Sequence, residues 1–174
     1  RYKDAVDILK KILNKNPDNE RAYFYAGIIR YYEKNYISAR INFDAAIKLK
    51  PNWSECYNYL GKVLFELNDI DGAITNYKKA LAIDEKNSTA HYELGKLYLS
   101  IKDFHNAVLQ FTKAIYLDSG NEDLRREFSQ TFFLLGIENY NKEDYQTALS
   151  NFVKSNQIYP GNQTELFIAK CRVK

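Results

Sequence analysis

Two cysteines and two histidines are the side chains in this chain best suited to chemistry. Thiolates and imidazoles can hold zinc, a thiolate can act as a nucleophile, and two cysteines can form a disulfide. Cys56 and Cys171 lie far apart in the sequence, so we expect two reduced thiols rather than a disulfide or a zinc site. The sequence also contains no phosphate-binding glycine loop, nucleophile elbow or zinc-protease histidine pair. It therefore predicts no enzyme activity and no catalytic, cofactor-binding or metal site.

The elements that carry these residues repeat at a fixed period. A pattern of alanine, aromatic residue and alanine recurs every 34 positions, at Ala39, Phe43 and Ala46, at Ala73, Tyr77 and Ala80, and at Ala107, Phe111 and Ala114. Glycine keeps the same spacing at Gly27, Gly61 and Gly95. His91 stands where the earlier copies have Tyr23 and Tyr57, so we interpret it as a packed substitute for an aromatic residue rather than a catalytic base. We expect His105 to be exposed.

Each copy contains two amphipathic segments, because apolar residues recur at intervals of three and four between turn signals. The small residues fit where two helix backbones come closest, and the adjoining aromatic rings fill the remaining space. This pattern resembles the tetratricopeptide repeat, a helix–turn–helix unit of about 34 residues. The resemblance implies an all-α fold, a right-handed superhelical solenoid of stacked antiparallel helix pairs that serves as a protein-binding scaffold.

The resemblance covers nearly all of residues 1–174, which we expect to form a single solenoid domain. Full repeats are predicted at residues 20–53, 54–87, 88–121 and 129–162, with turns at the joins between helices. Residues 1–19 are expected to be the second helix of a truncated repeat. Residues 163–174 are expected to be a capping helix or the next first helix. Because the chain starts inside a repeat, we expect the native N-terminus to be missing.

An insertion interrupts the period before the last full repeat. Ala107 and Ala148 are 41 positions apart instead of 34, and we place the seven extra residues at 122–128. Residues 122–141 keep apolar side chains on one face, which predicts one helix about two turns longer than its counterparts. We expect the added turns to protrude from an edge of the solenoid, with Arg125 and Arg126 facing solvent.

Three Asn-x-Ser/Thr triplets begin at Asn52, Asn87 and Asn162 and match the glycosylation signal. All three lie at joins between repeats, where an asparagine can cap the next helix. We therefore interpret them as helix caps.

The composition argues against two other classes of function. The formal net charge is only +3 and the lysines are spread along the chain, so nucleic-acid binding is not expected. No stretch approaches the roughly 18 apolar residues of a membrane span, so membrane insertion is not expected either. The sequence leaves the compartment open, with the cytoplasm slightly favoured.

The resemblance places partner binding on the concave face, which the first helix of each repeat lines in this family. The second, fifth, ninth and twelfth positions of the repeats supply the expected partner-binding residues: Arg21, Phe24, Ile28, Tyr31, Asn58, Lys62, Phe65, Tyr92, Lys96, Leu99, Phe133, Ile137 and Tyr140. Aromatic side chains around Lys62 and Lys96 suit a protein or peptide segment with apolar anchors and some acidic character.

Two specialised binding modes of the family do not match. A carboxylate clamp needs lysine and asparagine where this chain has Phe24 and Ile28, and an asparagine ladder needs asparagine where it has Tyr25 and Tyr59. The prediction is therefore a non-catalytic interaction scaffold, and the alternative is a regulatory or substrate-recruiting part of an enzyme whose catalytic domain lies elsewhere. We also expect self-association through the truncated N-terminal helix, where Ile8 and Ile12 belong to an uncovered apolar stripe.

Overall fold

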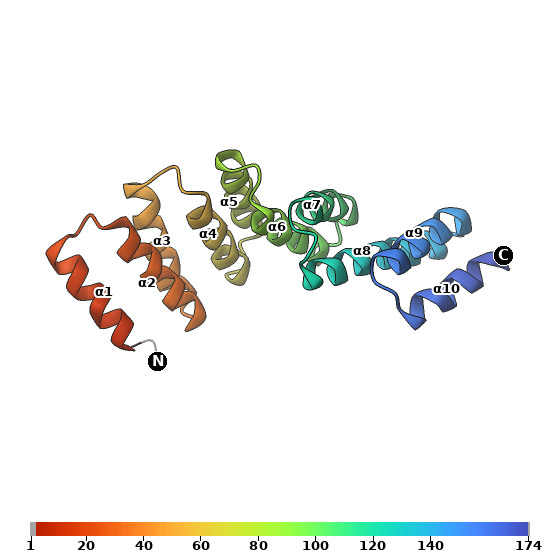
Figure 1. The fold of residues 1–174 in the computed structure, drawn as a ribbon, viewed down its shortest axis with the longest axis horizontal. Helices are drawn as coiled ribbons and strands as arrows, with labels where there is room; N and C mark the ends of the chain where they lie inside the picture. The colour runs from red at the N-terminus through yellow and green to blue at the C-terminus, as the bar shows by residue number, and fades with distance from the viewer. Residues whose placement is uncertain (1–2, 174) are drawn as a thin grey trace. The chain divides into compact units, whose positions relative to one another are not determined.

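A computed structural model describes residues 3–173, except for the side chain of Asn162. These residues form ten α-helices and no strand. The helices are α1 (Lys3–Lys15), α2 (Glu20–Tyr32), α3 (Tyr36–Leu49), α4 (Ser54–Glu66), α5 (Ile70–Ile83), α6 (Ser88–Ser100), α7 (Phe104–Leu117), α8 (Glu122–Asn141), α9 (Tyr145–Ile158) and α10 (Asn162–Arg172) (Figure 1). Helices α2, α4 and α6 begin at Glu20, Ser54 and Ser88, the first residues predicted for three of the full repeats. The all-α fold is confirmed.

Two compact units divide the chain, one of residues 1–90 and one of residues 91–174, with the division in the first turn of α6. In the first unit, α3 packs against both α2 and α4, α4 packs against α5, and α1 lies against α2. In the second unit, α8 packs against α7 and α9, and α10 packs against α9. Each unit is therefore a stack of antiparallel helix pairs, while the single domain spanning 1–174 stays a prediction.

The closest helix contacts bring a glycine backbone against an aromatic ring. A Cβ atom added to Gly61 would lie 2.7 Å from Cε1 of Tyr77, and one added to Gly27 would lie 2.7 Å from Cε1 of Phe43. The same contact recurs in the second unit, where Gly136 meets the ring of Phe152. These rings are buried, so no other residue fits at the glycine positions without displacing them. This confirms that the periodic glycines permit close helix packing.

The turn inside each helix pair has a left-handed residue followed by a helix cap. Lys34, Asn68, Lys102 and Glu143 have φ angles between 59° and 63°. The next residue in each case is an Asn or Asp whose side chain accepts a hydrogen bond from the backbone N–H three positions on, at Asn35, Asp69, Asp103 and Asp144. This pair of residues turns the chain sharply and satisfies a free N–H at the start of the second helix.

The expected capping role of the Asn-x-Ser/Thr triplets is correct at one position. The side chain of Asn87 accepts a hydrogen bond from Ala90 N at 2.9 Å. The interpretation of Asn52 as a cap is wrong, because α4 follows Trp53 and has no side-chain cap. The side chain of Asn162 lies outside the described residues.

The inserted segment forms the start of one continuous helix, as predicted. Helix α8 has 20 residues, against 13 in α4. Ser129 marks the point in α8 that corresponds to the start of α4, because its hydroxyl donates to Ser155 O at 2.9 Å as that of Ser54 donates to Ala80 O at 2.8 Å.

The added turns of α8 pack against their neighbours rather than protruding, which corrects one expectation. Leu124 is buried, and the ring of Phe128 lies 6.1 Å from that of Phe111 on α7. On another side, the guanidinium of Arg126 lies 5.6 Å from the ring of Tyr159. Arg125 and Arg126 are nevertheless exposed, as expected.

We expect Gly61→Ala to destabilise the protein although alanine favours helices. Overpacking at a buried ring costs about 1–3 kcal/mol, more than the roughly 1 kcal/mol that replacing glycine by alanine returns within a helix. Urea unfolding followed by circular dichroism measures the difference. Gly120→Ala is the control, because a Cβ there meets only Asp118 Oδ1 at 3.6 Å. Equal midpoints for the two variants would contradict this account.

Replacing the left-handed lysine at residue 34 with glycine should stabilise the protein. A left-handed non-glycine residue costs roughly 1–2 kcal/mol, and glycine avoids this cost while losing about 0.5–1 kcal/mol of backbone entropy. Lys34→Gly should therefore raise the urea midpoint, whereas Asn68→Gly should leave it nearly unchanged because asparagine tolerates this conformation. A lower midpoint for Lys34→Gly would show that the lysine side chain stabilises the turn.

Candidate functional site

Tyr59 on α4 is the centre of an aromatic cluster on the first-helix face of the first unit, the face formed by α2 and α4. Its ring lies 5.7 Å from Phe24 and 6.4 Å from Tyr31, both edge-on, and stacks at 5.7 Å on Phe43. The Nζ of Lys62 lies 5.6 Å from the centre of the same ring. Tyr59 thus brings together Phe24, Tyr31 and Lys62, three of the residues that the sequence predicts to bind a partner. Tyr59 itself is not among those predicted residues.

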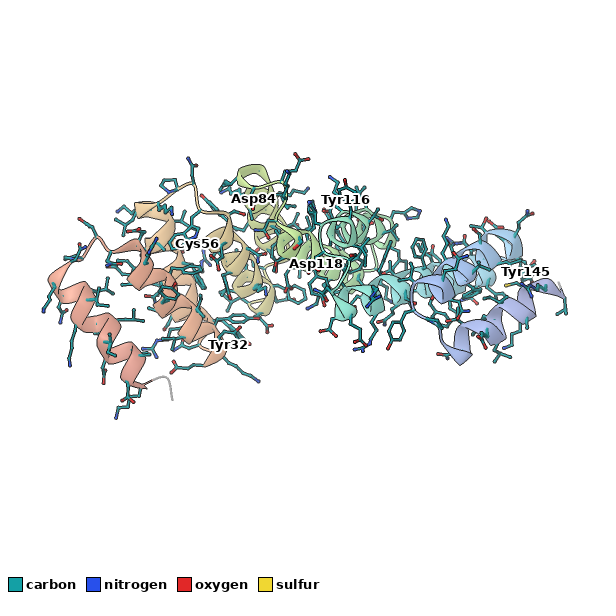
Figure 2. The ribbon with its side chains drawn as sticks, viewed as in Figure 1. Tyr32, Cys56, Asp84, Tyr116, Asp118 and Tyr145 are labelled. Atoms are coloured by element: carbon teal, nitrogen blue, oxygen red, sulfur yellow. The ribbon has the colours of Figure 1, made fainter. Side chains whose placement is uncertain are left out.

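The expected site residues of the first unit differ in their access to a partner. Phe24 is only 3% exposed, because Trp53 covers it at a ring distance of 4.4 Å. It therefore packs beneath the aromatic cluster and is not itself open to a partner. Asn58 is also buried. Arg21 is exposed, Ile28, Tyr31 and Lys62 are partly exposed, and Phe65 is 37% exposed. Tyr25 and Tyr32 add exposed aromatic area on α2. Tyr32 is labelled in Figure 2.

In the second unit, Tyr92 on α6 is half-buried beside Phe111, at a ring distance of 6.2 Å. Lys96 lies over the Tyr92 ring at 5.2 Å, and its Nζ is 3.6 Å from a Glu93 carboxylate oxygen. The lysine charge is therefore balanced within the protein. Leu99, one turn further along α6, is partly exposed.

Helix α10 covers the expected site residues of the last full repeat. The ring of Phe167 lies 5.7 Å from Phe133 and 5.8 Å from Tyr140, in both cases edge-on. Ile137 packs in the same cluster, against the buried side chains of Ala148, Phe152 and Cys171. These three site residues are therefore largely part of an internal cluster. The sequence pattern gives no signal for this contact, because it fits residues 163–174 either to a capping helix or to the next first helix.

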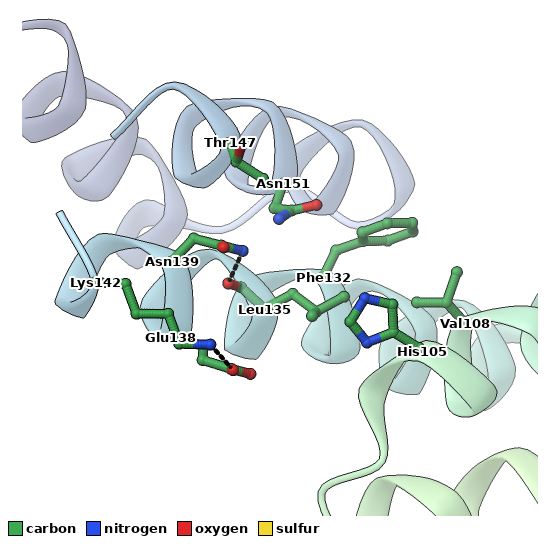
Figure 3. Close-up of a pocket in the computed structure, with 9 residues that line it drawn as sticks. All are labelled: His105, Val108, Phe132, Leu135, Glu138, Asn139, Lys142, Thr147 and Asn151. Carbon is green, nitrogen blue, oxygen red and sulfur yellow. Dashed lines mark hydrogen bonds and ion pairs between the residues drawn. The ribbon is translucent and has the colours of Figure 1, made fainter. Parts of the chain in front are cut away.

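Two similar hollows lie on the other side of the helix pairs, where second helices meet the next pair. The hollow in the second unit, of about 330 Å³, is lined by residues of α7, α8 and α9 that include His105, Leu135, Asn139 and Asn151 (Figure 3). Within it, Asn139 donates to Leu135 O at 2.8 Å, and Glu138 pairs with Lys142. The first unit has a hollow of about 350 Å³ between α3, α4 and α5. Their recurrence follows from the repeat packing.

The surroundings of the cysteines and histidines fit roles in packing rather than in chemistry. Burial raises the pKa of the Cys56 thiol to about 12, with Asp44 and Glu55 adding to the shift, and burial also raises the pKa of Cys171. Both thiols therefore stay protonated at neutral pH and are poor nucleophiles. His91 is buried, as expected, with Nδ1 2.8 Å from Gln110 Oε1, and His105 is exposed.

Within residues 3–173, no group of three His, Cys, Asp or Glu side chains is placed to hold a metal ion. None of the described helices has both the length and the apolar character needed to cross a membrane.

Comparisons with known proteins agree with this helix-pair architecture. Two family models match, one described as TPR repeat over residues 61–102 and one described as tetratricopeptide repeat over residues 88–121. The chain carries tetratricopeptide repeats. The second match has the bounds predicted for the third repeat. None of the curated proteins matches the chain significantly.

Solved structures with a similar fold are also tetratricopeptide-repeat proteins. YrrB, described as having an unusual peptide-binding site, is 22% identical over 96% of this chain and 82% of its own, with a TM-score of 0.70. A thermophilic protein of this class from Thermus thermophilus is 15% identical over 100% and 92%, with a TM-score of 0.67. MamA of Desulfovibrio magneticus is 23% identical over 89% and 84%, with a TM-score of 0.68. At these identities, the likeness shows the fold.

Tyr92 should make the stability of the tetratricopeptide-repeat protein sensitive to alkaline pH. Burial raises the pKa of Tyr92 to about 12 from its ordinary value of 10.0, and Glu127, Glu93 and Asp123 add to the shift. Below pH 10.0 the Tyr92 phenol is protonated in both the folded and the unfolded chain, so the folded state keeps the full stability that the protonated phenol gives it. Between pH 10.0 and about 12 the unfolded chain loses the proton while the folded chain keeps it, so stability falls as pH rises.

Tyr92→Phe should therefore lose less stability than the wild type between those pH values, as measured by urea midpoints at several pH values. Tyr116→Phe is the control, since Tyr116 is 88% exposed and its surroundings change little on unfolding. Parallel pH curves for the wild type and Tyr92→Phe would show that Tyr92 is solvated in the folded protein.

Proposed function

We propose that this protein is a non-catalytic scaffold that binds a segment of a partner protein on the first-helix face. The observation that carries this proposal is the aromatic cluster around Tyr59, in which buried Phe24 supports partly exposed Tyr31 and Lys62. Aromatic side chains held by packing lose little entropy when they bind, and such side chains often carry most of an interface's affinity. The described peptide-binding site of YrrB supports peptide recognition on this fold.

The first unit is proposed as the main anchor site. Phe65 and Tyr32 expose aromatic area beside this cluster, whereas α10 covers Phe133 and Tyr140 in the second unit. A partner with apolar anchors fits this aromatic area, and exposed Arg21 would favour acidic residues near them. At Tyr92 the ion pair of Lys96 with Glu93 weakens any preference for acidic residues.

Self-association is a separate proposal for α1. Ile8 is 58% exposed and Ile12 is 37% exposed, and none of the described residues of α1 is buried. An exposed apolar stripe of this kind favours contact with another apolar surface.

We expect Phe65→Ala and Tyr92→Ala each to weaken partner binding by about 2 kcal/mol, because a few aromatic anchors dominate most interfaces. A pull-down from the native cell with peptide mapping would supply a binding peptide, and calorimetry would give its affinity for each variant. Circular dichroism should show nearly unchanged helicity.

Tyr116→Ala is the matched control, because Tyr116 is a tyrosine that is 88% exposed and lies on α7, the second helix of its pair. If Tyr116→Ala weakened binding while Phe65→Ala and Tyr92→Ala did not, the binding surface would be on the other side of the helix pairs.

A further inference from the structure

Three tyrosines gather where α2 ends and α3 begins, and we call Tyr31, Tyr32 and Tyr36 the tyrosine edge. The ring centre of Tyr31 lies 5.5 Å from that of Tyr32 and 5.8 Å from that of Tyr36. Tyr32 is 58% exposed, and Tyr36 is partly exposed. Parts of these two rings are therefore open to a partner, next to the aromatic cluster around Tyr59, to which Tyr31 also belongs.

A carboxylate lies beside the tyrosine edge. Burial raises the pKa of Tyr36, and the hydrogen bond that its hydroxyl donates to Glu66 and the charge of that carboxylate add to the shift. Glu66 is exposed. A carboxylate has about four positions at which it accepts hydrogen bonds, so Glu66 can accept from a partner as well as from Tyr36.

The tyrosine edge also lies at the C-terminal ends of two first helices. Tyr31 and Tyr32 are in the last turn of α2, and Glu66 is the last residue of α4. The C-terminal ends of helices carry partial negative charge, and the faces of aromatic rings are negative as well. Ring faces, helix ends and a carboxylate therefore all favour a cation at this place.

Two basic side chains of the protein near this place have contacts of their own. Nη1 of Arg30 lies 2.7 Å from Oε2 of Glu33, so the charge of Arg30 is balanced. Nζ of Lys62 lies 5.6 Å from the centre of the Tyr59 ring. Neither of these contacts involves the tyrosine edge or Glu66, so neither occupies the place that a partner's cation would take.

The second unit repeats the tyrosine pair in different surroundings. Tyr140 and Tyr145 hold the positions in their repeat that Tyr31 and Tyr36 hold in the first, and their ring centres lie 5.2 Å apart. There the ring of Phe167 packs edge-on against Tyr140 at 5.8 Å. The protein itself thus supplies an apolar neighbour in the second unit, whereas in the first unit the tyrosine pair lies beside a charged group.

We propose that the tyrosine edge and Glu66 bind an arginine side chain of the partner segment. The guanidinium is planar, so it can stack on the exposed ring faces while its N–H groups donate to the Glu66 carboxylate. Lysine fits less well, because its ammonium is a strongly hydrated point charge without a flat surface. This inference rests on the proposed function and adds the chemistry of one anchor of the bound segment.

The test uses dodecamer peptides selected from a random display library on the wild-type protein. In a selected peptide, each arginine is replaced in turn by citrulline, which has nearly the same shape but no charge. At one position we expect this exchange to lower affinity about tenfold for the wild type but less than about twofold for Glu66→Gln. Fluorescence anisotropy of the labelled peptides gives these dissociation constants.

Glu55→Gln is the matched control, because Glu55 is also an exposed glutamate of α4 but lies in its first turn, roughly 16 Å from Glu66 along the helix axis. Charges that far apart are largely screened at about 0.1 M salt, so this variant should keep the full citrulline effect. Tyr32→Leu removes an exposed ring face while Glu66 stays in place, and it should lower the citrulline effect to about threefold. Circular dichroism should show unchanged helicity for all three variants.

The outcomes separate this inference from the function on which it rests. Equal citrulline effects on the wild type and on Glu66→Gln would overturn the inference, and so would selected peptides that contain no arginine. In both cases, peptides whose binding needs Phe65 would still support the proposed function. Unchanged affinity after an exchange of the peptide arginine for lysine would overturn the choice of arginine. If the library yielded no binding peptide, the proposed function itself would fail, and this inference with it.

Discussion

The fold depends on one contact, the approach of a glycine backbone in a first helix to an aromatic ring in the second helix of the same pair. Gly61 against Tyr77 and Gly136 against Phe152 show it in each unit. Without a Cβ atom at the glycine, the two helices pack at a distance that buries the ring fully. The alanines one turn on either side of the ring, such as Ala73 and Ala80, are then completely buried as well. The fixed period of the sequence is the repetition of this contact.

The turn of each pair solves a second, local problem, because the chain must reverse within a few residues. The left-handed residue followed by an Asx cap does this at four places, yet none of the four left-handed residues is a glycine. The strain at Lys34, Lys102 and Glu143 is offset by the caps and by the packing of the two helices that each turn joins. The fold therefore tolerates an unfavourable local conformation because the pair as a whole fixes it.

The aromatic surface follows from the same packing. Tyr59 stacks on Phe43, one of the rings in contact with glycine, and so the cluster that we propose as a partner anchor stands directly on the core. Such an anchor is rigid before a partner arrives, which reduces the entropy lost on binding. In the second unit Phe167 occupies a comparable place against Phe133 and Phe152, so the protein itself fills that part of the surface.

The helices, their turns and the long α8 can be predicted from the sequence alone, because each follows from local spacing and from the small and aromatic residues that helix pairing requires. The sequence also indicated Lys62, Phe65 and Tyr92 as side chains with access to a partner. Three features depend on contacts between helices and could not be read from the sequence: Phe24 is buried under Trp53, Phe167 covers Phe133, and Oδ1 of Asn58 is buried without a hydrogen-bond partner among the described residues. Periodicity specifies which face of a helix a residue occupies. Burial depends on which side chains from other helices reach that face, and this is set by packing between residues distant in the sequence.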